Sequence, residues 1–202
     1  MILGVIPARL NSTRFPSKVI FPLKGKPIIE HVYEKALQSN LLNKVIVAVD
    51  SEETKNVINC QNIIMTSDKH QSGTDRVAEV ANNFNCDIVV NIQGDEPGID
   101  PLLIDKLIQL FEDPDVEMAS IASTDLKEDD LNNDNVVKVN LDKENNAISF
   151  IRNNLNPEST YYRHIGIYAY RKNTLNLFTS LTQSNNEKNH RLEQLRALDN
   201  NI

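Results

Sequence analysis

The sequence has little cysteine, and this excludes several kinds of protein. Its only cysteines, Cys60 and Cys86, lie far apart and form no CxxC pattern, so we expect neither a disulfide framework nor a zinc site. The chain also has no run of about 18 apolar residues, and residues 1–6 are too short for the core of a signal peptide. We therefore expect a cytoplasmic protein that does not bind a membrane.

The chain is poor in basic residues as a whole. It has 21 Lys and Arg against 28 Asp and Glu, which gives a formal net charge of −7 over 202 residues. This balance argues against a nucleic-acid partner, because nucleic-acid-binding proteins usually present a basic face. The length and the apolar fraction of 40% suit a single domain with its own core.

Acidic residues are absent from the first 29 residues, so this segment is positively charged although the whole chain is negatively charged. Five basic residues precede the first acid, Glu30: Arg9, Arg14, Lys18, Lys24 and Lys26. Basic side chains and turn amides bind phosphate oxygens, so the loop after residue 6 is predicted to bind a polyphosphate. The alternative is a solvated basic loop. The loop lacks both G-x-x-x-x-G-K-[ST] and G-x-G-x-x-G, which disfavours a P-loop ATPase and a dinucleotide oxidoreductase.

Short apolar runs alternate with segments of helical periodicity in the first half. Strands are predicted at 3–6, 45–49, 63–65 and 88–92, and helices at 27–38, 51–58, 74–84 and 101–111. This alternation is typical of an α/β fold with a mostly parallel central sheet and helices on both faces. Ligands bind at the carboxyl ends of such strands, and three polar loops follow strands here, at 7–14, 66–76 and 93–97. We expect these loops to converge on one edge of the sheet.

The second half differs in composition. Residues 112–144 carry eleven acids against three lysines. Strands are predicted at 136–141, 147–151 and 161–170, with a turn at 143–146, and short helices at 173–181 and 190–198. We expect a mixed or antiparallel addition to the parallel sheet.

The loop Gln93-Gly94-Asp95-Glu96-Pro97 follows the most apolar strand. Mg²⁺ commonly takes one or two carboxylates plus substrate phosphates, so Asp95 is a candidate metal ligand. Gly94 permits close approach of the backbone, and Gln93 can bind a sugar hydroxyl or a carboxylate. The alternative is a polar turn that caps the next helix.

Three further segments carry weaker signals. In residues 70–76, Ser72 or Thr74 is predicted to cap the helix that follows, and helix N-termini also attract anions. Alternation on the strand at 163–168 puts His164, Gly166 and Tyr168 on one face, although a lone strand histidine is more often structural. Glu193 on the last helix is, by itself, a solvated charge.

Together these segments resemble a known family. PARLNSTRFPSK, HQSGTDR, NIQGDEP, NVVKV, RHIGIYAYR and LEQLR occur in an order and at spacings similar to those of the 3-deoxy-manno-octulosonate (Kdo) cytidylyltransferases. The resemblance runs from residue 1 to about residue 198. It implies a Rossmann-like nucleotidyltransferase fold and a homodimer, with residues 1–112 as the nucleotide-binding half and 113–202 as the sugar-binding and dimerisation half.

The resemblance also implies a reaction and a set of residues. CTP and Kdo would give CMP-Kdo and pyrophosphate with Mg²⁺, in the cytoplasm, for lipopolysaccharide biosynthesis. The catalytic residues would be Arg9, Lys18 and Asp95, the last of which would bind the metal. The nucleotide would contact Ala8, Arg9, Arg14, Lys18, Ser72, Gly73 and Arg76. The sugar would contact Gln93, Arg152, His164, Tyr168, Glu193 and Gln194.

The chain departs from the family pattern in two places. The family continues past the LEQLR segment with a strand, a Val-Asp-Thr-Pro-Glu-Asp-like motif that supplies a second magnesium ligand, and a helix. This chain ends at Ile202, so we expect either a fragment or a shortened relative. The segment between Ile151 and Tyr161, near the expected sugar pocket and dimer contact, is also shorter than the family's.

Two other functions are compatible with the sequence. One is cytidylyl transfer to a different acidic sugar, such as an 8-amino Kdo analogue or a nonulosonate, and the other is nucleotide binding without catalysis. A sugar-nucleotide glycosyltransferase is disfavoured, because Asp95-Glu96 is a poor match to the Asp-x-Asp expected there.

Overall fold

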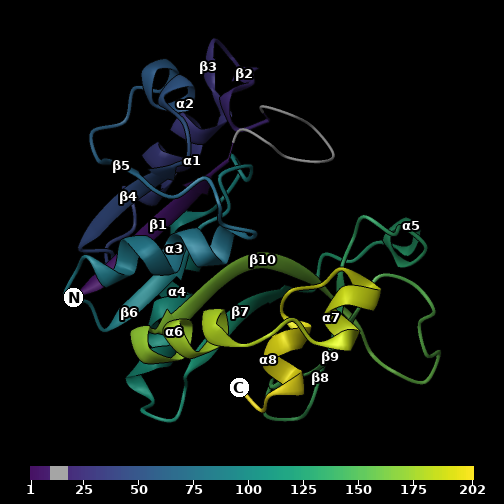
Figure 1. Ribbon diagram of the computed structural model, residues 1–202. Coiled ribbons are helices and arrows are strands. Elements are labelled where there is room, and N and C mark those ends of the chain that lie inside the picture. The colour runs from purple at the N-terminus through teal and green to yellow at the C-terminus, as the bar shows by residue number, and fades with distance from the viewer. Residues whose placement is uncertain (10–17) are drawn as a thin grey trace. The chain divides into compact units, whose positions relative to one another are not determined.

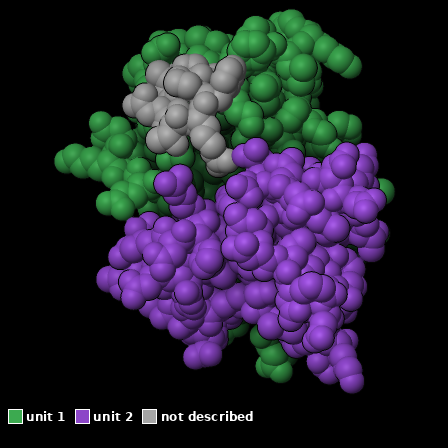
Figure 2. All heavy atoms as spheres, turned by 90° about the vertical axis from the view of Figure 1, so that its right-hand side faces the viewer, with its two compact units in different colours: residues 1–119, 167–179 green, residues 120–166, 180–202 purple. Residues whose placement is uncertain are grey.

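The computed structural model describes residues 1–9 and 18–202 (Figure 1). The chain divides into two compact units, coloured separately in Figure 2. Unit 1 contains Met1–Ala119 and Ile167–Thr179, and unit 2 contains Ser120–Gly166 and Ser180–Ile202. Among the described residues, no helix combines the length and the apolar composition needed to cross a lipid bilayer.

Unit 1 is built on a parallel sheet, as the sequence predicts. Its strands lie in the order β5-β4-β1-β6, and all three of these pairings are parallel. The C-terminal residues of β10, Tyr168 to Arg171, extend the sheet antiparallel to β6. The bounds are β1 Ile2–Ala8, β4 Lys44–Val49, β5 Ile63–Met65, β6 Ile88–Asn91 and β10 Tyr162–Arg171. A further strand, β7 (Met118–Ser123), pairs with β10.

Helices cover both faces of this sheet (Figure 1). On one face, α3 and α6 close a core around Leu3, Val5 and Val89. Helices α1 and α4 contact the same strands and each other, and they carry a separate set of buried residues. The bounds are α1 Ile28–Ala36, α2 Glu52–Val57, α3 Gly73–Asn82, α4 Pro101–Gln109 and α6 Lys172–Ser180, with single 3₁₀ turns η1 Lys18–Ile20 and η2 Leu110–Glu112. The predicted α/β fold class is therefore confirmed.

Unit 2 is built on an antiparallel hairpin. β8 (Lys138–Leu141) pairs with β9 (Ala147–Ile151) across the predicted turn, and the N-terminal part of β10 pairs with β8. Short helices complete the unit: α5 Glu128–Leu131, α7 Asn185–His190 and α8 Leu195–Asp199. Val139, Phe150, Leu192 and Leu195 form its apolar core.

Some predicted elements differ from those observed. The helix expected to begin at Pro27 begins one residue later, because Pro27 is extended and pairs with Pro22 in a small hairpin of β2 (Pro22–Leu23) and β3 (Lys26–Pro27). The single helix expected at 190–198 is wrong. Arg191 has a φ of 54° and ends α7, so α8 starts only at Leu195. β7 and α5 were not predicted from the sequence, because β7 (MASIAS) does not alternate apolar with polar residues and α5 is only four residues long.

Candidate functional site

The carboxyl end of β1 leads into the predicted polyphosphate loop. Ala8 is fully buried, and the next residue, Arg9, is exposed. The Arg9 Nη1 group donates a hydrogen bond to the Gln71 carbonyl oxygen at 3.4 Å. This contact joins the first predicted loop to the second. Arg14, the other predicted arginine of the loop, lies outside the described residues.

Lys18 and Asp95 join the first loop to the third. The Lys18 Nζ and the Asp95 Oδ2 are 2.8 Å apart, and both side chains are about two-fifths exposed, at 42% and 43%. The pair therefore stays open to solvent and to an incoming ligand. It holds a lysine and a carboxylate, each suited to phosphate or metal, within one hydrogen bond of each other.

Two glycines let the three loops pack together around Pro7. A Cβ atom at Gly94 would lie 2.9 Å from the Pro7 carbonyl oxygen, which is closer than real side chains approach. A Cβ atom at Gly73 would lie 3.4 Å from the Pro7 ring. The close backbone approach predicted at Gly94 is confirmed. The predicted convergence of the loops is also confirmed, for the part of each loop that the structure describes.

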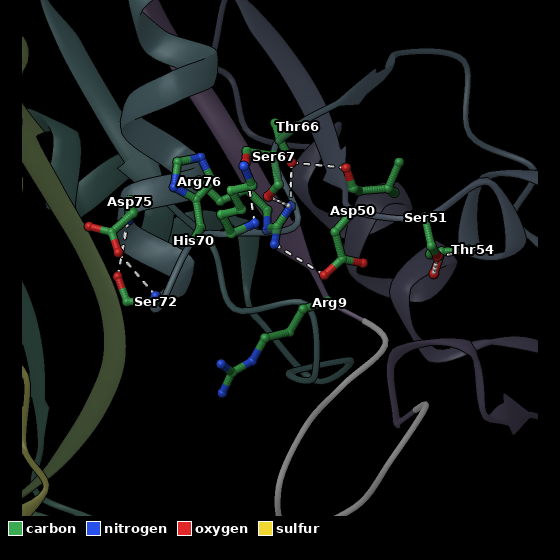
Figure 3. A network of polar contacts seen from close by, with 12 residues as sticks. Arg9, Asp50, Ser51, Thr54, Thr66, Ser67, His70, Ser72, Asp75 and Arg76 are labelled. Atoms are coloured by element: carbon green, nitrogen blue, oxygen red, sulfur yellow. Dashed lines mark hydrogen bonds and ion pairs between the residues drawn. The ribbon is translucent and has the colours of Figure 1, made fainter.

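The Arg76 side chain is buried in unit 1, and its guanidinium points toward Asp50 and Thr66 (Figure 3). Its side chain is 2% exposed, and Nη2 lies 3.1 Å from the Asp50 Oδ2. Nη1 donates to the Thr66 hydroxyl and to the Ser67 carbonyl oxygen, the latter at 3.3 Å. Burial lowers the pKa of Arg76, and the Asp50 carboxylate opposes this effect. One guanidinium thus ties α3 to the ends of β4 and β5.

The loop before α3 is held by two further groups of hydrogen bonds. Ser72 caps the helix, as predicted: its Oγ accepts from the Asp75 amide at 3.1 Å, and the Asp75 carboxylate accepts from the Ser72 amide at 3.0 Å. His70 donates from Nε2 to the Glu79 carboxylate, which also accepts from the Ser67 amide at 3.0 Å. Burial raises the pKa of Glu79, but these hydrogen bonds outweigh it and leave the pKa below its usual value.

The predicted sugar residues fall in both units. Two of them belong to unit 1: Gln93, two residues after the end of β6, and Tyr168, which stacks on Tyr170 with ring centroids 6.1 Å apart. The other four, Arg152, His164, Glu193 and Gln194, belong to unit 2.

His164 is held by two contacts within unit 2. Its Nε2 lies 2.8 Å from the Ser120 Oγ, and its ring meets the Phe150 ring edge-on at 4.9 Å between centroids. Burial lowers its pKa to about 4, so the imidazole is neutral at pH 7.

Arg152, Glu193 and Gln194 each have a defined place in unit 2. The Arg152 Nη1 group donates to the Asp134 carbonyl oxygen at 2.8 Å. Gln194 is buried, and Glu193 lies 3.7 Å from the Arg196 guanidinium. Arg196 in turn forms a buried ion pair with Glu187, and the closest N–O distance is 2.6 Å. This pair ties α7 to α8 and fixes the backbone that carries Glu193 and Gln194.

Two residues that hold the Arg76 guanidinium, Asp50 and Thr66, were not among the predicted site residues. Asp50 directly follows the strand β4, in the same kind of position that Asp95 occupies near the end of β6. That position was a usable signal, because side chains after parallel strands gather at one edge. Thr66 directly follows the parallel strand β5 and begins the loop 66–76, so the same signal was present there.

Comparisons with known proteins identify the family. The sequence profile of a family described as Cytidylyltransferase matches residues 3–202. A 3-deoxy-manno-octulosonate cytidylyltransferase from Pelobacter propionicus is 40% identical over 218 residues, covering 98% of this chain and 86% of the relative. One from Solibacter usitatus is 41% identical over 208 residues, covering 98% and 82%.

Solved structures extend the comparison to the fold. A CMP:2-keto-3-deoxy-manno-octonic acid synthetase complexed with CTP matches with a TM-score of 0.92 and 36% identity, covering 100% of this chain and 86% of that chain. A cytidylyltransferase from Leptospira borgpetersenii shares the fold, with a TM-score of 0.64 and 17% identity over 100% of this chain and 73% of that chain. The resemblance seen in the sequence motifs is confirmed. The chain therefore belongs to the cytidylyltransferase family, with 3-deoxy-manno-octulosonate cytidylyltransferases among its relatives.

Proposed function

We propose that this chain transfers the cytidylyl group of CTP to Kdo, giving CMP-Kdo and pyrophosphate. The observation that carries the proposal is the match, over the whole chain, to a synthetase solved with CTP bound. The names of the curated relatives support the same acceptor. The converging loops of unit 1 supply the positive charge and the carboxylate that such a transfer needs.

The nucleotide end of the site is assigned to the loops of unit 1. Arg9 and Lys18, together with Arg14 from outside the described residues, would neutralise the triphosphate. The backbone at Ala8, Ser72 and Gly73 would border the nucleotide. Arg76 has its guanidinium engaged with Asp50, Thr66 and Ser67, so we propose that it positions the loop 66–72 rather than touching phosphate.

The donor set at Asp95 fits Mg²⁺. Mg²⁺ in nucleotide enzymes takes one or two carboxylates and completes its shell with phosphate oxygens and water. Asp95 supplies one such carboxylate beside Lys18, and no group of three or more His, Cys, Asp or Glu side chains suited to a metal occurs among the described residues. We assign Asp95 as the metal ligand. When bound with CTP, Mg²⁺ would neutralise negative charge on the reacting phosphates.

The reaction itself requires one bond to form and one to break. The anomeric hydroxyl oxygen of Kdo would attack the α-phosphorus of CTP, and the bond to the β-phosphate bridging oxygen would break in line with it. Pyrophosphate leaves with that oxygen, and the hydroxyl proton is lost. Arg9 and Lys18 would hold the phosphates throughout and stabilise the charge on the leaving group. No covalent intermediate with the protein is needed.

The acceptor end is assigned to the six predicted sugar residues. Kdo is a carboxylate, and Arg152 is the cation we assign to it. His164 is neutral at pH 7, so it would offer a hydrogen bond to a sugar hydroxyl and no charge. Gln93, Tyr168, Glu193 and Gln194 would complete the polar contacts of the sugar.

We also propose that the protein acts in the cytoplasm as a homodimer and feeds lipopolysaccharide assembly. Light scattering of the purified chain gives the oligomeric state directly. A dimer has twice the chain mass of 22.8 kDa, and a mass of 22.8 kDa at micromolar concentration would contradict the proposal.

The decisive experiment is pyrophosphate release from CTP with Mg²⁺, with and without Kdo. We expect release that depends on Kdo and is abolished by EDTA. Asp95→Asn should lower kcat/KM by about a hundredfold or more, because the metal carboxylate is lost. Asp115→Asn makes the same chemical change on an exposed residue of unit 1 and should keep the parent rate. CTP binding by a folded chain that releases no pyrophosphate would contradict the proposed activity, and release with another acidic sugar alone would change the acceptor.

A further inference from the structure

Unit 2 contains a lysine whose charge is fully buried. Lys138 begins β8, the middle strand of the β10-β8-β9 arrangement, and is 0% exposed. Its direct neighbours across the sheet are Arg163 on β10 and Ile151 on β9, so neither neighbour brings a negative charge. Burying an ammonium group costs free energy unless its hydrogen bonds are satisfied, so the Lys138 ammonium must have hydrogen-bond acceptors inside unit 2.

The Lys138 ammonium is satisfied by backbone oxygens. Nζ donates to the Asn133 carbonyl oxygen at 2.9 Å and to the Arg152 carbonyl oxygen at 2.5 Å. Within the described residues, no carboxylate oxygen lies within 4.0 Å of this ammonium. Burial lowers the pKa of Lys138, while the more distant Asp134 and Asp130 raise it and Arg152 lowers it further. The lysine therefore acts through hydrogen bonds rather than an ion pair. We call its two hydrogen bonds, to the Asn133 and Arg152 carbonyl oxygens, the Lys138 brace.

The brace connects Arg152 to the segment before β8. The Arg152 guanidinium donates to the Asp134 carbonyl oxygen at 2.8 Å, next to the Asn133 carbonyl that Lys138 holds. Asn153 donates to the Asp134 side chain at 3.2 Å. Lys138 thus fixes the Arg152 backbone and the segment against which the Arg152 side chain rests. Lys138 therefore holds the Arg152 backbone directly. It also holds the Asn133 carbonyl, which is next to the Asp134 carbonyl that the Arg152 guanidinium contacts.

We infer that Lys138 is a positioning residue for the acceptor, because it fixes the backbone and the resting place of Arg152, the cation assigned to the acceptor carboxylate. This inference rests on the proposed function. An apolar side chain of similar size would fill the same space but could not hold the Asn133 and Arg152 carbonyl oxygens, so the ammonium group fixes these two backbone groups in particular. An arginine that binds a carboxylate bidentately does require a fixed orientation.

Steady-state kinetics with both substrates tests this. Lys138→Met keeps the length and apolar stem of the side chain but removes its donors, and we expect the KM for Kdo to rise about tenfold or more while the KM for CTP stays within about twofold. Lys138→Arg keeps the charge and should restore part of the Kdo affinity. Lys172→Met is the matched control in unit 1, where a lysine likewise donates to a backbone carbonyl, that of Phe84 at 2.7 Å. It should leave both KM values at the parent level.

A double-mutant cycle separates positioning from general loosening. If Lys138 acts through Arg152, the double variant Lys138→Met with Arg152→Lys should bind Kdo little worse than Arg152→Lys alone. Additive effects of the two changes, or a Lys138→Met variant with a lowered melting temperature and an unchanged KM for Kdo, would overturn the inference.

Calorimetric titration with Kdo distinguishes a failure of the proposed function from a failure of the inference about Lys138. A parent chain that binds Kdo without forming CMP-Kdo contradicts the proposed function, and the same cycle is then read from the Kd for Kdo. A parent that transfers the cytidylyl group but shows no Lys138 effect contradicts only the inference. A parent that neither binds nor uses Kdo contradicts both.

Discussion

At the scale of single residues, Gly94 shows how little space separates the loops of unit 1. Gly94→Ala would place a methyl group 2.9 Å from the Pro7 carbonyl oxygen, and the backbone of β1 would have to shift. We expect the free energy of unfolding to fall by roughly 1–3 kcal/mol and the KM for CTP to rise, since Pro7 leads directly to Arg9. Denaturant titration and kinetics measure both effects.

The control for this change lies four residues away. A Cβ atom at Gly98 would meet nothing within 4 Å. Gly98→Ala should therefore leave stability and the KM for CTP near the parent values. If both alanine variants behaved alike, the close approach at Gly94 would not matter.

His164 makes a prediction about pH. Its pKa is lowered from 6.5 to about 4 in the folded chain, so the unfolded chain binds more protons between these values. Its contribution to stability is therefore fully present above pH 6.5 and is lost as the pH falls toward 4. His164→Asn should make the free energy of unfolding depend less steeply on pH in this window. Urea titrations from pH 4 to pH 7 test this, and an unchanged slope would contradict it.

At the scale of elements, two helices begin with the same device. Ser72 and Asp75 form a capping box at α3, and Ser184 and Glu187 form one at α7. Ser72→Ala and Ser184→Ala should each lower the free energy of unfolding by about 0.5–2 kcal/mol. Only Ser72→Ala should also raise the KM for CTP, because only α3 begins in a loop of the candidate nucleotide site.

The capping pair is informative because the two changes are chemically identical. Equal stability losses with different KM values for CTP would separate helix capping from ligand binding. If Ser184→Ala raised the KM for CTP as much as Ser72→Ala, the nucleotide role of the loop before α3 would be contradicted.

At the scale of the whole molecule, each unit has its own apolar core. We proposed that residues 1–112 bind nucleotide and residues 113–202 bind the sugar. Hydrogen exchange should then show CTP with Mg²⁺ protecting amides in the loops 66–76 and 93–97. Kdo should protect amides around 133–134 and 152–164, with a smaller effect at Gln93. Protection by Kdo confined to residues 1–87 would contradict this division.

The sequence by itself determined the order of elements in unit 1 and the position of the polar loops. Strands 45–49 and 63–65 and the cap at Ser72 follow from local patterns of apolar and capping residues, which act over a few positions. The apolar periodicity failed where a local turn of the backbone ends or delays a helix. Pro27 is drawn into a hairpin, and Arg191 turns left-handed to end α7.

The roles of individual side chains were decided by the tertiary structure. Nothing local distinguishes Arg76, which is buried against Asp50, from Arg9, which stays exposed on the loop after β1. Likewise, Lys138 becomes a buried brace only because Arg152 follows the neighbouring strand. Burial and hydrogen-bond partners come from segments far apart in the chain, so only the folded arrangement decides which charges face a ligand and which hold the loops that do.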